Sequence, residues 1–190
     1  TMGQRIDVRL QLPSEPRSFP ILALREGSRE RTGIILRPAR AAVAKIATAG
    51  DDDAPVLDLL LEAKLRAVAS LPSRPADKKF DMALTGDMAA YRWGLKTNEP
   101  ILVDVGDRVE VTLRNTSMMA HPMHLHGHHF QVVAIDGQRF AGAMRDTVLL
   151  PPMRSVTIAV DAENPGQWAF HCHHLYHMAT GMMSTFGYEA

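Results

Sequence analysis

The sequence lacks the charge imbalance that marks many binding proteins. Its 190 residues include 21 acidic and 21 basic side chains, so the formal net charge is zero. No basic block is present, and the longest run of one charge is Asp51-Asp52-Asp53. Because nucleic-acid binding relies on clustered positive charge, we expect no nucleic-acid partner.

Long apolar runs and paired cysteines are also missing. No stretch approaches the roughly 20 apolar residues that a helix needs to cross a membrane, so we expect no membrane span. A single cysteine, Cys172, excludes an internal disulfide and leaves the redox compartment undetermined. The sequence shows no signal peptide, and an alternating segment begins within a few residues of its start. We therefore expect this chain to be part of a longer protein.

Histidine, by contrast, is concentrated in one region. All nine histidines lie between His121 and His177, and Cys172 lies directly between His171 and His173. Thiolate and imidazole together favour copper or zinc over harder ions. The sequence therefore predicts a soft-metal site in the last third of the chain.

Residues 1–40 are predicted to form three short strands, at 5–12, 19–24 and 33–36, separated by turn signals. Three strands make a poor independent domain, because a small sheet needs a partner layer. We interpret them as the C-terminal strands of a preceding β domain.

Residues 41–78 are predicted to be an interdomain linker that carries one amphipathic helix at 55–69. Asp53 suits the N-cap of this helix, and Pro55 suits its first turn. One face of the helix would be apolar: Leu57, Leu61, Leu65 and Val68. We expect that face to pack on a neighbouring surface.

Residues 79–190 have the pattern of an all-β domain, with a turn signal about every ten residues. Strands are predicted at 80–85, 101–105, 108–114, 129–135, 146–150, 155–160, 167–172 and 183–188. Seven or eight such strands indicate a Greek-key β-sandwich, which would be the metal-binding domain.

Strand geometry divides the histidines into two groups. Successive side chains point to opposite faces of a strand, so residues i and i+2 share a face. If the stretch around Cys172 is extended, its thiol points one way while His171 and His173 point the other way. His124 and His126 also share a face, and they can join that pair if the two strands are neighbours. Four outward-facing imidazoles imply a metal site shared with another protein surface.

The cysteine's side of the strand has its own candidate ligands. His121 has the opposite parity to His124, although the intervening Pro122 softens this argument. His177 and Met182 follow the cysteine by five and ten residues. Two imidazoles, a thiolate and a weak thioether are the ligand set of a blue-copper electron-transfer site.

Two motifs, His-Pro-Met-His-Leu-His-Gly-His at 121–128 and His-Cys-His-His-Leu-Tyr-His-Met-Ala-Thr-Gly-Met-Met at 171–183, resemble the C-terminal copper signatures of the multicopper oxidases. That family includes laccases, ascorbate oxidase, ferroxidases and bacterial copper-resistance oxidases. Supporting matches are Trp93, Arg145-Asp146-Thr147-Val148 and Asn164-Pro165-Gly166-Gln167-Trp168. The resemblance covers about 80–190 as the last cupredoxin domain and, more weakly, 4–37 as the end of the second. It implies a cupredoxin-like sandwich preceded by strands of a neighbouring cupredoxin domain.

Residue by residue, the resemblance implies a set of copper ligands. A type 1 copper would be bound by His121, Cys172, His177 and Met182. A trinuclear centre would take His124 at its type 2 copper and His126, His171 and His173 at its type 3 pair. The resemblance also implies that Cys172 and its two flanking histidines relay electrons to that centre, where dioxygen is reduced to water.

The chain departs from the family in one respect. The trinuclear centre of the family takes eight histidines, of which this chain supplies four. The others would come from missing N-terminal cupredoxin domains, in the same or another chain, so we expect this chain alone to be inactive.

The expected function is that of a laccase-like oxidase acting on a phenolic or other organic reductant, or on Cu(I). The resemblance implies a periplasmic or secreted location. The alternative is a non-enzymatic cupredoxin that transfers electrons or sequesters copper, but a simple carrier needs no second cluster. A copper nitrite reductase is disfavoured because a longer spacing from cysteine to histidine is expected there.

Some of these residues also allow interpretations other than copper binding. Zinc is disfavoured because it usually gathers four ligands in one tetrahedron, whereas strand parity gives two groups. Met182 is the softest ligand assignment, since Met183 is adjacent and methionine commonly fills cores. His128, His129 and His174 are expected to lie near the ligands or at the surface without binding metal. Eleven methionines leave open either a route for Cu(I) or ordinary packing.

Overall fold

The computed structural model describes residues 1–11, 14–15 and 17–189, and the chain divides into two compact units. One unit is Ile6–Asp58, and the other comprises Thr1–Arg5 together with Leu59–Ala190. No helix among the described residues is long and apolar enough to cross a membrane.

The smaller unit is built around one antiparallel pair, β1 (Phe19–Leu24) and β2 (Arg31–Leu36), which confirms two of the three predicted strands. The strand predicted at 5–12 is wrong for residues 5–11, which form no strand, while residue 12 lies outside the described residues. Ile6, Val8 and Leu10 alternate in sequence but are 64%, 67% and 51% exposed. Alternation alone therefore does not make a strand when no partner offers hydrogen bonds and an apolar face.

Residues 41–78, the predicted linker, contain much less helix than predicted. Instead of a helix at 55–69 there is one 3₁₀ turn, η1 (Glu62–Lys64). Leu61 and Val68, two residues of the expected apolar face, are exposed. Leu59 is buried in the core instead, and the Glu62 carboxylate accepts two hydrogen bonds from the Arg145 guanidinium. These two anchors do not follow a helical repeat, which explains why the periodicity was misleading.

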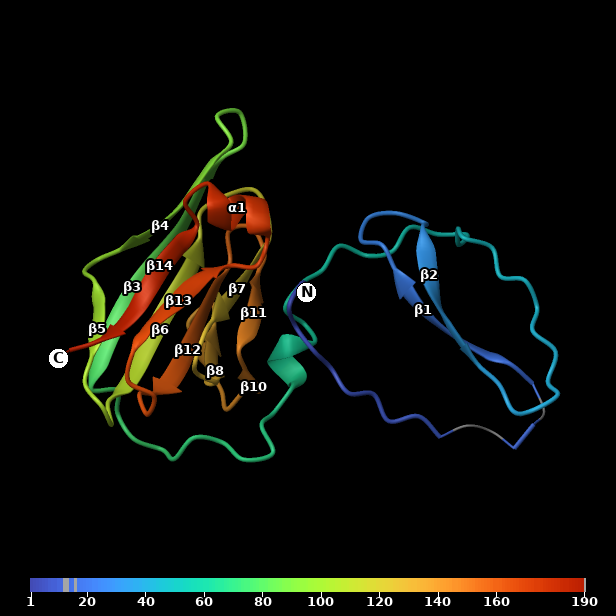
Figure 1. The fold of residues 1–190 in the computed structure, drawn as a ribbon, viewed down its shortest axis with the longest axis horizontal. Helices are drawn as coiled ribbons and strands as arrows, with labels where there is room; N and C mark the ends of the chain where they lie inside the picture. Colours follow the sequence, from blue (N-terminus) through green and yellow to red (C-terminus); the bar gives the residue numbers. More distant parts are fainter. Residues whose placement is uncertain (12–13, 16, 190) are drawn as a thin grey trace. The chain divides into compact units, whose positions relative to one another are not determined.

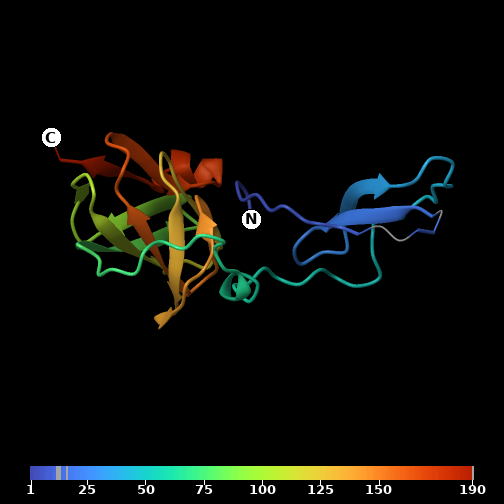
Figure 2. The same cartoon turned by 90° about the horizontal axis from the view of Figure 1, so that it is seen from below.

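The larger unit is a β-sandwich (Figures 1 and 2). Its first sheet contains β3 (Lys78–Asp87), β4 (Arg92–Thr97), β6 (Arg108–Asn115), β8 (Phe130–Ile135), β9 (Gln138–Arg139), β10 (Met144–Arg145) and β12 (Ser155–Asp161). Its second sheet contains β5 (Ile101–Val103), β7 (His121–Leu125), β11 (Thr147–Leu150), β13 (Gln167–Cys172) and β14 (Met183–Tyr188). A short helix, α1 (Leu175–Ala179), lies at one end of the sandwich. The predicted all-β sandwich is confirmed.

The sheet order brings distant segments together. The first sheet runs β10-β8-β12-β6-β3-β4, with β9 paired to β8, and the second runs β11-β7-β13-β14-β5. Two pairings are parallel, β3 with β6 and β14 with β5, and the remaining pairings within these two sheets are antiparallel. The sequence did not predict β4 and β7. A glycine and charged residues interrupt the first, and Pro122 and the histidines obscure the alternation of the second.

The core lies between the two sheets and fixes the position of β13. Phe130, Phe170 and Phe186 are fully buried there. Burying one such side chain contributes about 1.5–3 kcal/mol relative to leaving it in water. Because β13 lies between β7 and β14, its backbone is hydrogen-bonded on both edges and presents its side chains in a fixed register.

Candidate metal centre

β13 presents neighbouring side chains to two different environments. In its pairing with β7, His171 lies opposite His124, and Cys172 lies opposite Met123. The pairing continues one residue past the strand, where the His173 N–H donates to the Pro122 carbonyl. The condition set by strand parity, that the two histidine-bearing strands be neighbours, is therefore met.

The first group, the cysteine cluster, consists of His121, Cys172 and His177. The Sγ atom of Cys172 lies 3.7 Å from Nδ1 of His121 and 3.8 Å from Nδ1 of His177. The two Nδ1 atoms are 3.1 Å apart, and all three side chains are buried. One thiol and two imidazole nitrogens thus converge on a single point inside the protein.

Met182 lies at the end of the loop that begins at Cys172, and its backbone is hydrogen-bonded to two members of this cluster. Its backbone N–H donates to the His177 carbonyl, and its carbonyl accepts from the Cys172 N–H. Its side chain is fully buried. Met183 is 52% exposed, so of the two adjacent methionines only Met182 belongs to the interior.

A hydrogen-bonded chain orients the ring of His121. The Ser117 hydroxyl donates to Oδ1 of Asn115 and accepts from Nε2 of His121, at 2.9 Å and 2.7 Å. Asn115 in turn donates to the carbonyls of Met119 and Leu150. With its proton on Nε2, the His121 ring presents the Nδ1 lone pair to the thiol, which is how outer hydrogen bonds orient metal ligands.

Burial sets the protonation of this cluster. Desolvation, followed by the neighbouring His177 and His174, lowers the pKa of His121 to about 3. Burial raises the pKa of the Cys172 thiol to about 11, opposed by a hydrogen bond from the His174 backbone. A metal ion bound here would therefore displace the thiol proton, while the His121 imidazole is already neutral.

Trp93 packs against the cysteine cluster from β4. Its ring stacks on that of His177, with centroids 4.0 Å apart, and meets His121 edge-on at 5.2 Å. In the sequence, Trp93 is only a supporting match in a family resemblance. The stack shows that it holds the orientation of a candidate ligand.

His174 lies near this cluster, which agrees with the expectation that it would lie near the ligands or at the surface. One ring nitrogen of His174 and the donor atoms of His121, Cys172 and His177 all lie within 4.8 Å of one another. It is two residues beyond Cys172, so alternation continued past the end of β13 would also place it on the side of the thiol.

The second group, the outer cluster, consists of His124, His126 and His171. Their donor nitrogens lie within 4.8 Å of one another, and the Nε2 atoms of His126 and His171 are 2.9 Å apart. His126 is exposed, whereas His171 is only 5% exposed. The cluster therefore opens outward, as the sequence predicted.

Backbone carbonyls orient two of these rings. Nδ1 of His124 donates to the Asp146 carbonyl at 2.8 Å, and the Thr147 hydroxyl lies 3.0 Å from the same nitrogen. Nδ1 of His171 donates to the Cys172 carbonyl at 2.9 Å. Both rings therefore present Nε2 to the centre of the cluster. Desolvation lowers the pKa of both imidazoles and favours their neutral, metal-binding form.

His173 lies at the edge of the outer cluster and outside its tightest group. Its ring centroid is 5.5 Å from that of His124 and 5.9 Å from that of His171. Its Nδ1 atom is buried and has no hydrogen-bond partner among the described residues. Gly3, at a φ of +78°, lies so close to this ring that a Cβ there would be 2.5 Å from it. The sequence-predicted fourth histidine is therefore adjacent to the cluster.

His128 and His129 remain outside both groups. Nδ1 of His128 donates to the His126 carbonyl, and its Nε2 accepts from the Tyr188 hydroxyl at 2.6 Å. Both ring nitrogens of His128 are thus engaged in hydrogen bonds, and its expected lack of a metal-binding role stays a prediction. His129 is exposed.

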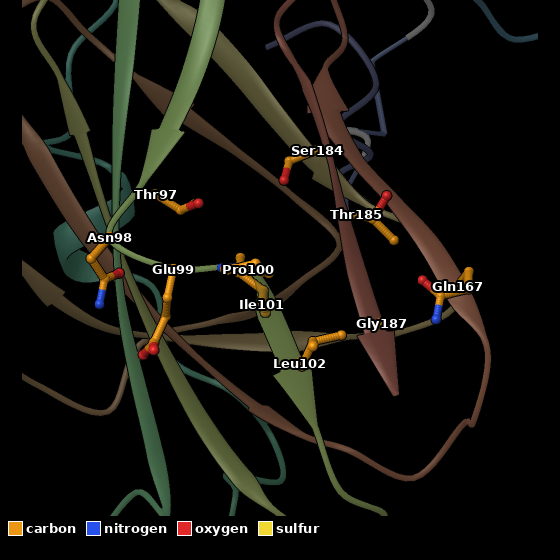
Figure 3. Close-up of a pocket in the computed structure, with 10 residues that line it drawn as sticks. All are labelled: Thr97, Asn98, Glu99, Pro100, Ile101, Leu102, Gln167, Ser184, Thr185 and Gly187. Carbon is orange, nitrogen blue, oxygen red and sulfur yellow. The ribbon is translucent and has the colours of Figure 1, made fainter. Parts of the chain in front are cut away.

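A groove elsewhere on the sandwich has no metal-binding character. Figure 3 shows that its lining comes from the β4–β5 turn on one side and from β13 and β14 on the other. Its lining residues are Thr97, Asn98, Glu99, Pro100, Ile101, Leu102, Gln167, Ser184, Thr185 and Gly187. Glu99 is its one ionisable side chain, and it contains neither histidine nor cysteine.

Comparisons with known proteins match the same region. The sequence model of the multicopper oxidase family matches residues 72–189. Multicopper oxidase MmcO of Mycobacterium tuberculosis (strain ATCC 25618 / H37Rv) is 40% identical over 112 residues, which cover 56% of this chain and 22% of that protein. Copper resistance protein A of Escherichia coli is 35% identical over 131 residues, which cover 63% of this chain and 21% of that protein. The chain thus spans about a fifth of the length of these relatives.

Solved structures show the same fold. A multi-copper oxidase from Pseudomonas thermotolerans matches with a TM-score of 0.58 and 24% identity, covering 94% of this chain and 41% of that one. McoA from Aquifex aeolicus matches with a TM-score of 0.53 and 26% identity, covering 64% of this chain and 32% of that one. The predicted cupredoxin-like fold is confirmed.

Proposed function

Because this chain belongs to the multicopper oxidase family, whose cofactor is copper, we propose that it is the C-terminal portion of a laccase-like copper oxidase. The observation that carries the proposal is the pair of donor clusters on opposite sides of β13. A chain that only carried electrons would need the cysteine cluster alone.

The cysteine cluster would hold the type 1 copper. The proposed ligands are His121, Cys172, His177 and Met182. The convergence of the thiol with two Nδ1 atoms supports this assignment, since thiolate and imidazole suit copper. The hydrogen bond from His121 to Ser117 fixes the ring for that role.

The outer cluster would hold half of a trinuclear copper centre. The proposed ligands are His124 at the type 2 copper and His126, His171 and His173 at the type 3 pair. The convergence of donor nitrogens from His124, His126 and His171 within 4.8 Å supports a bound ion, since imidazole suits copper. The missing half would come from N-terminal cupredoxin domains, so this chain alone is inactive as an oxidase.

When bound, copper would accept single electrons at the cysteine cluster and reduce dioxygen to water at the outer cluster. The residues of this chain supply the connection between the two. Cys172 lies on one side of β13, and the adjacent His171 and His173 lie on the other, so a short covalent path joins both sites. His171 also donates a hydrogen bond to the Cys172 carbonyl, which gives a second connection.

The reductant would be a phenolic or other organic molecule, or Cu(I). We further propose that residues 1–40 are the C-terminal strands of a preceding cupredoxin domain, that 41–78 are the linker and that 79–190 are the copper-binding domain. A periplasmic or secreted location is supported by the similarity to copper resistance protein A.

The first experiment tests the cysteine cluster. The copper-loaded chain should show the intense visible absorption of a copper–thiolate bond, and Cys172→Ser should lose it while remaining folded by circular dichroism. A colourless wild-type chain that holds copper contradicts the type 1 assignment.

The second experiment tests the oxidase. The chain is mixed with the N-terminal cupredoxin domains of its parent protein, and oxygen uptake is measured with a phenol and, separately, with Cu(I). Uptake that requires both parts and is lost in His126→Ala supports the shared centre. A folded, copper-replete complex without uptake supports copper sequestration instead.

A further inference from the structure

The side chain of His174 contacts the cysteine cluster. It occupies the N-cap of α1, yet its side chain makes no capping hydrogen bond. The residues preferred at this position are Ser, Thr, Asp and Asn, whose side chains accept from a free backbone N–H, and histidine is not one of them. The His174 ring instead lies edge-on to that of His177, with centroids 4.9 Å apart. The imidazole is therefore directed at the cysteine cluster rather than at its own helix.

The distances place His174 among the donor atoms. One of its ring nitrogens lies within 4.8 Å of the donor atoms of all three members of the cysteine cluster. The donor atoms of the other three residues lie within the same distance of one another. The His174 backbone also donates a hydrogen bond to the Cys172 thiol. The backbone N–H of His174 thus contacts the thiol, and its ring lies beside the donor atoms of the same cluster.

We propose that His174 is a third imidazole ligand of the metal ion held by Cys172, His121 and His177. The proposal rests on the function proposed above, because it requires a metal ion at the cysteine cluster. It adds a nitrogen donor that the family-derived ligand set, with Met182 as the weak fourth ligand, does not contain.

The extra donor has a consequence for the redox chemistry. Imidazole is a harder and more basic ligand than a thioether, so it stabilises Cu(II) relative to Cu(I). A site with three imidazoles and one thiolate therefore has a lower reduction potential than the same site without His174. It also has a weaker copper–thiolate bond, because the metal accepts part of its electron density from the additional nitrogen and less from the thiolate.

His174 also differs from the other ligands in exposure. His121 and His177 are buried, whereas His174 is half-buried and precedes the exposed residues Leu175 and Tyr176. His174 is therefore the most exposed of the three proposed imidazole ligands.

The test counts the imidazoles bound to Cu(II). The full chain is prepared with His126→Ala, so that the outer cluster contributes little copper, and pulsed electron paramagnetic resonance is recorded on the thiolate-bound copper. Three coordinated imidazoles are expected, falling to two when His174→Gln is added. The matched control is His129→Gln, which changes an exposed histidine outside both clusters and should leave the count at three.

The second readout is the reduction potential, which should rise in His174→Gln and stay unchanged in His129→Gln. Two imidazoles in the background chain that retains His174 overturn the proposal, whether or not the His174 variant folds. If that chain still shows the copper–thiolate absorption, the proposed function stands. Bound copper without this absorption overturns both.

Discussion

The thiol of Cys172 and the imidazole of His171 are sequence neighbours that face opposite environments. The thiol meets two buried rings, one of them fixed by Ser117, and this chain supplies every donor around it. The imidazole meets His126 at a surface that opens outward. One strand therefore carries one enclosed site and one open site. The alternation of the strand therefore decides only the face to which each side chain points. Whether a donor set is completed within this chain depends on the residues that surround that face.

The largest expected effect comes from removing the support that both clusters share. Phe170 is fully buried and pairs with Leu125 across β7 and β13. Phe170→Ala should destabilise the domain by about 3–5 kcal/mol, because it leaves a cavity in the core. Urea unfolding should show the loss, and copper binding should weaken at both clusters together. Tyr176→Ala, at a residue that is 77% exposed, is the control and should change neither.

The next prediction separates the two clusters. Cys172→Ala should abolish the copper–thiolate absorption while the outer cluster still binds copper weakly. His126→Ala should do the reverse. Copper per chain, measured after dialysis against a graded chelator, checks both variants. If either substitution removes copper from both places in a folded chain, the two clusters are not independent.

A smaller effect is expected from the hydrogen bonds that orient the rings. Ser117→Ala removes the acceptor for Nε2 of His121 and should weaken copper binding at the cysteine cluster by about 10- to 100-fold. Thr147→Val is the matched change at the outer cluster. It should cost less, because the Asp146 carbonyl still accepts from His124. Equal losses in a competition titration would contradict this reasoning.

The smallest effect is a dependence of stability on pH. Burial lowers the pKa of His121 to about 3 in the folded chain, from the ordinary histidine value of 6.5. Between these values the unfolded chain binds more protons, so the free energy of unfolding falls as the pH falls from 6.5 towards 3. The contribution of His121 to the free energy of unfolding is fully retained above pH 6.5. One such group gives a slope of at most about 1.4 kcal/mol per pH unit.

Denaturation midpoints of the metal-free chain at pH 7.0, about 6 and about 5 would measure this slope. In His121→Leu the slope over this window should decrease. An unchanged slope would assign the acid sensitivity to the other buried histidines, whose pKa values are also lowered by desolvation.

The sandwich and the two-sided cluster were predictable because both depend on alternation within strands. Turn signals and apolar positions located most strands of the larger unit, and parity divided Cys172 from its flanking histidines. The predictions of secondary structure were wrong where the spacing of apolar residues gave no information about the strand or surface that they would pack against. Ile6 and Leu10 alternate without a neighbouring strand, and Leu61 and Val68 repeat at helical spacing without a surface to cover.

The candidate site was missed in places where position depends on tertiary structure. His174 shares the parity of Cys172, but parity gives only its side of the strand and not the approach of its ring to the donor atoms of the cysteine cluster. Trp93 comes from β4, a strand that the sequence did not reveal, and only the folded chain brings it onto His177. Ser117 is an unremarkable loop residue in the sequence, and its role follows from its contact with His121.

The backbone hydrogen bond between the Cys172 N–H and the Met182 carbonyl has a consequence for insertions and deletions. It joins the two ends of the intervening loop, so a change of loop length leaves both sulfur-bearing residues where they are. Such a change would displace His177 and His174 instead. An added residue inside β13, by contrast, would exchange the two faces of the strand. Length variation in the loop should therefore disrupt the cysteine cluster alone, whereas an added residue in the strand should disrupt both clusters.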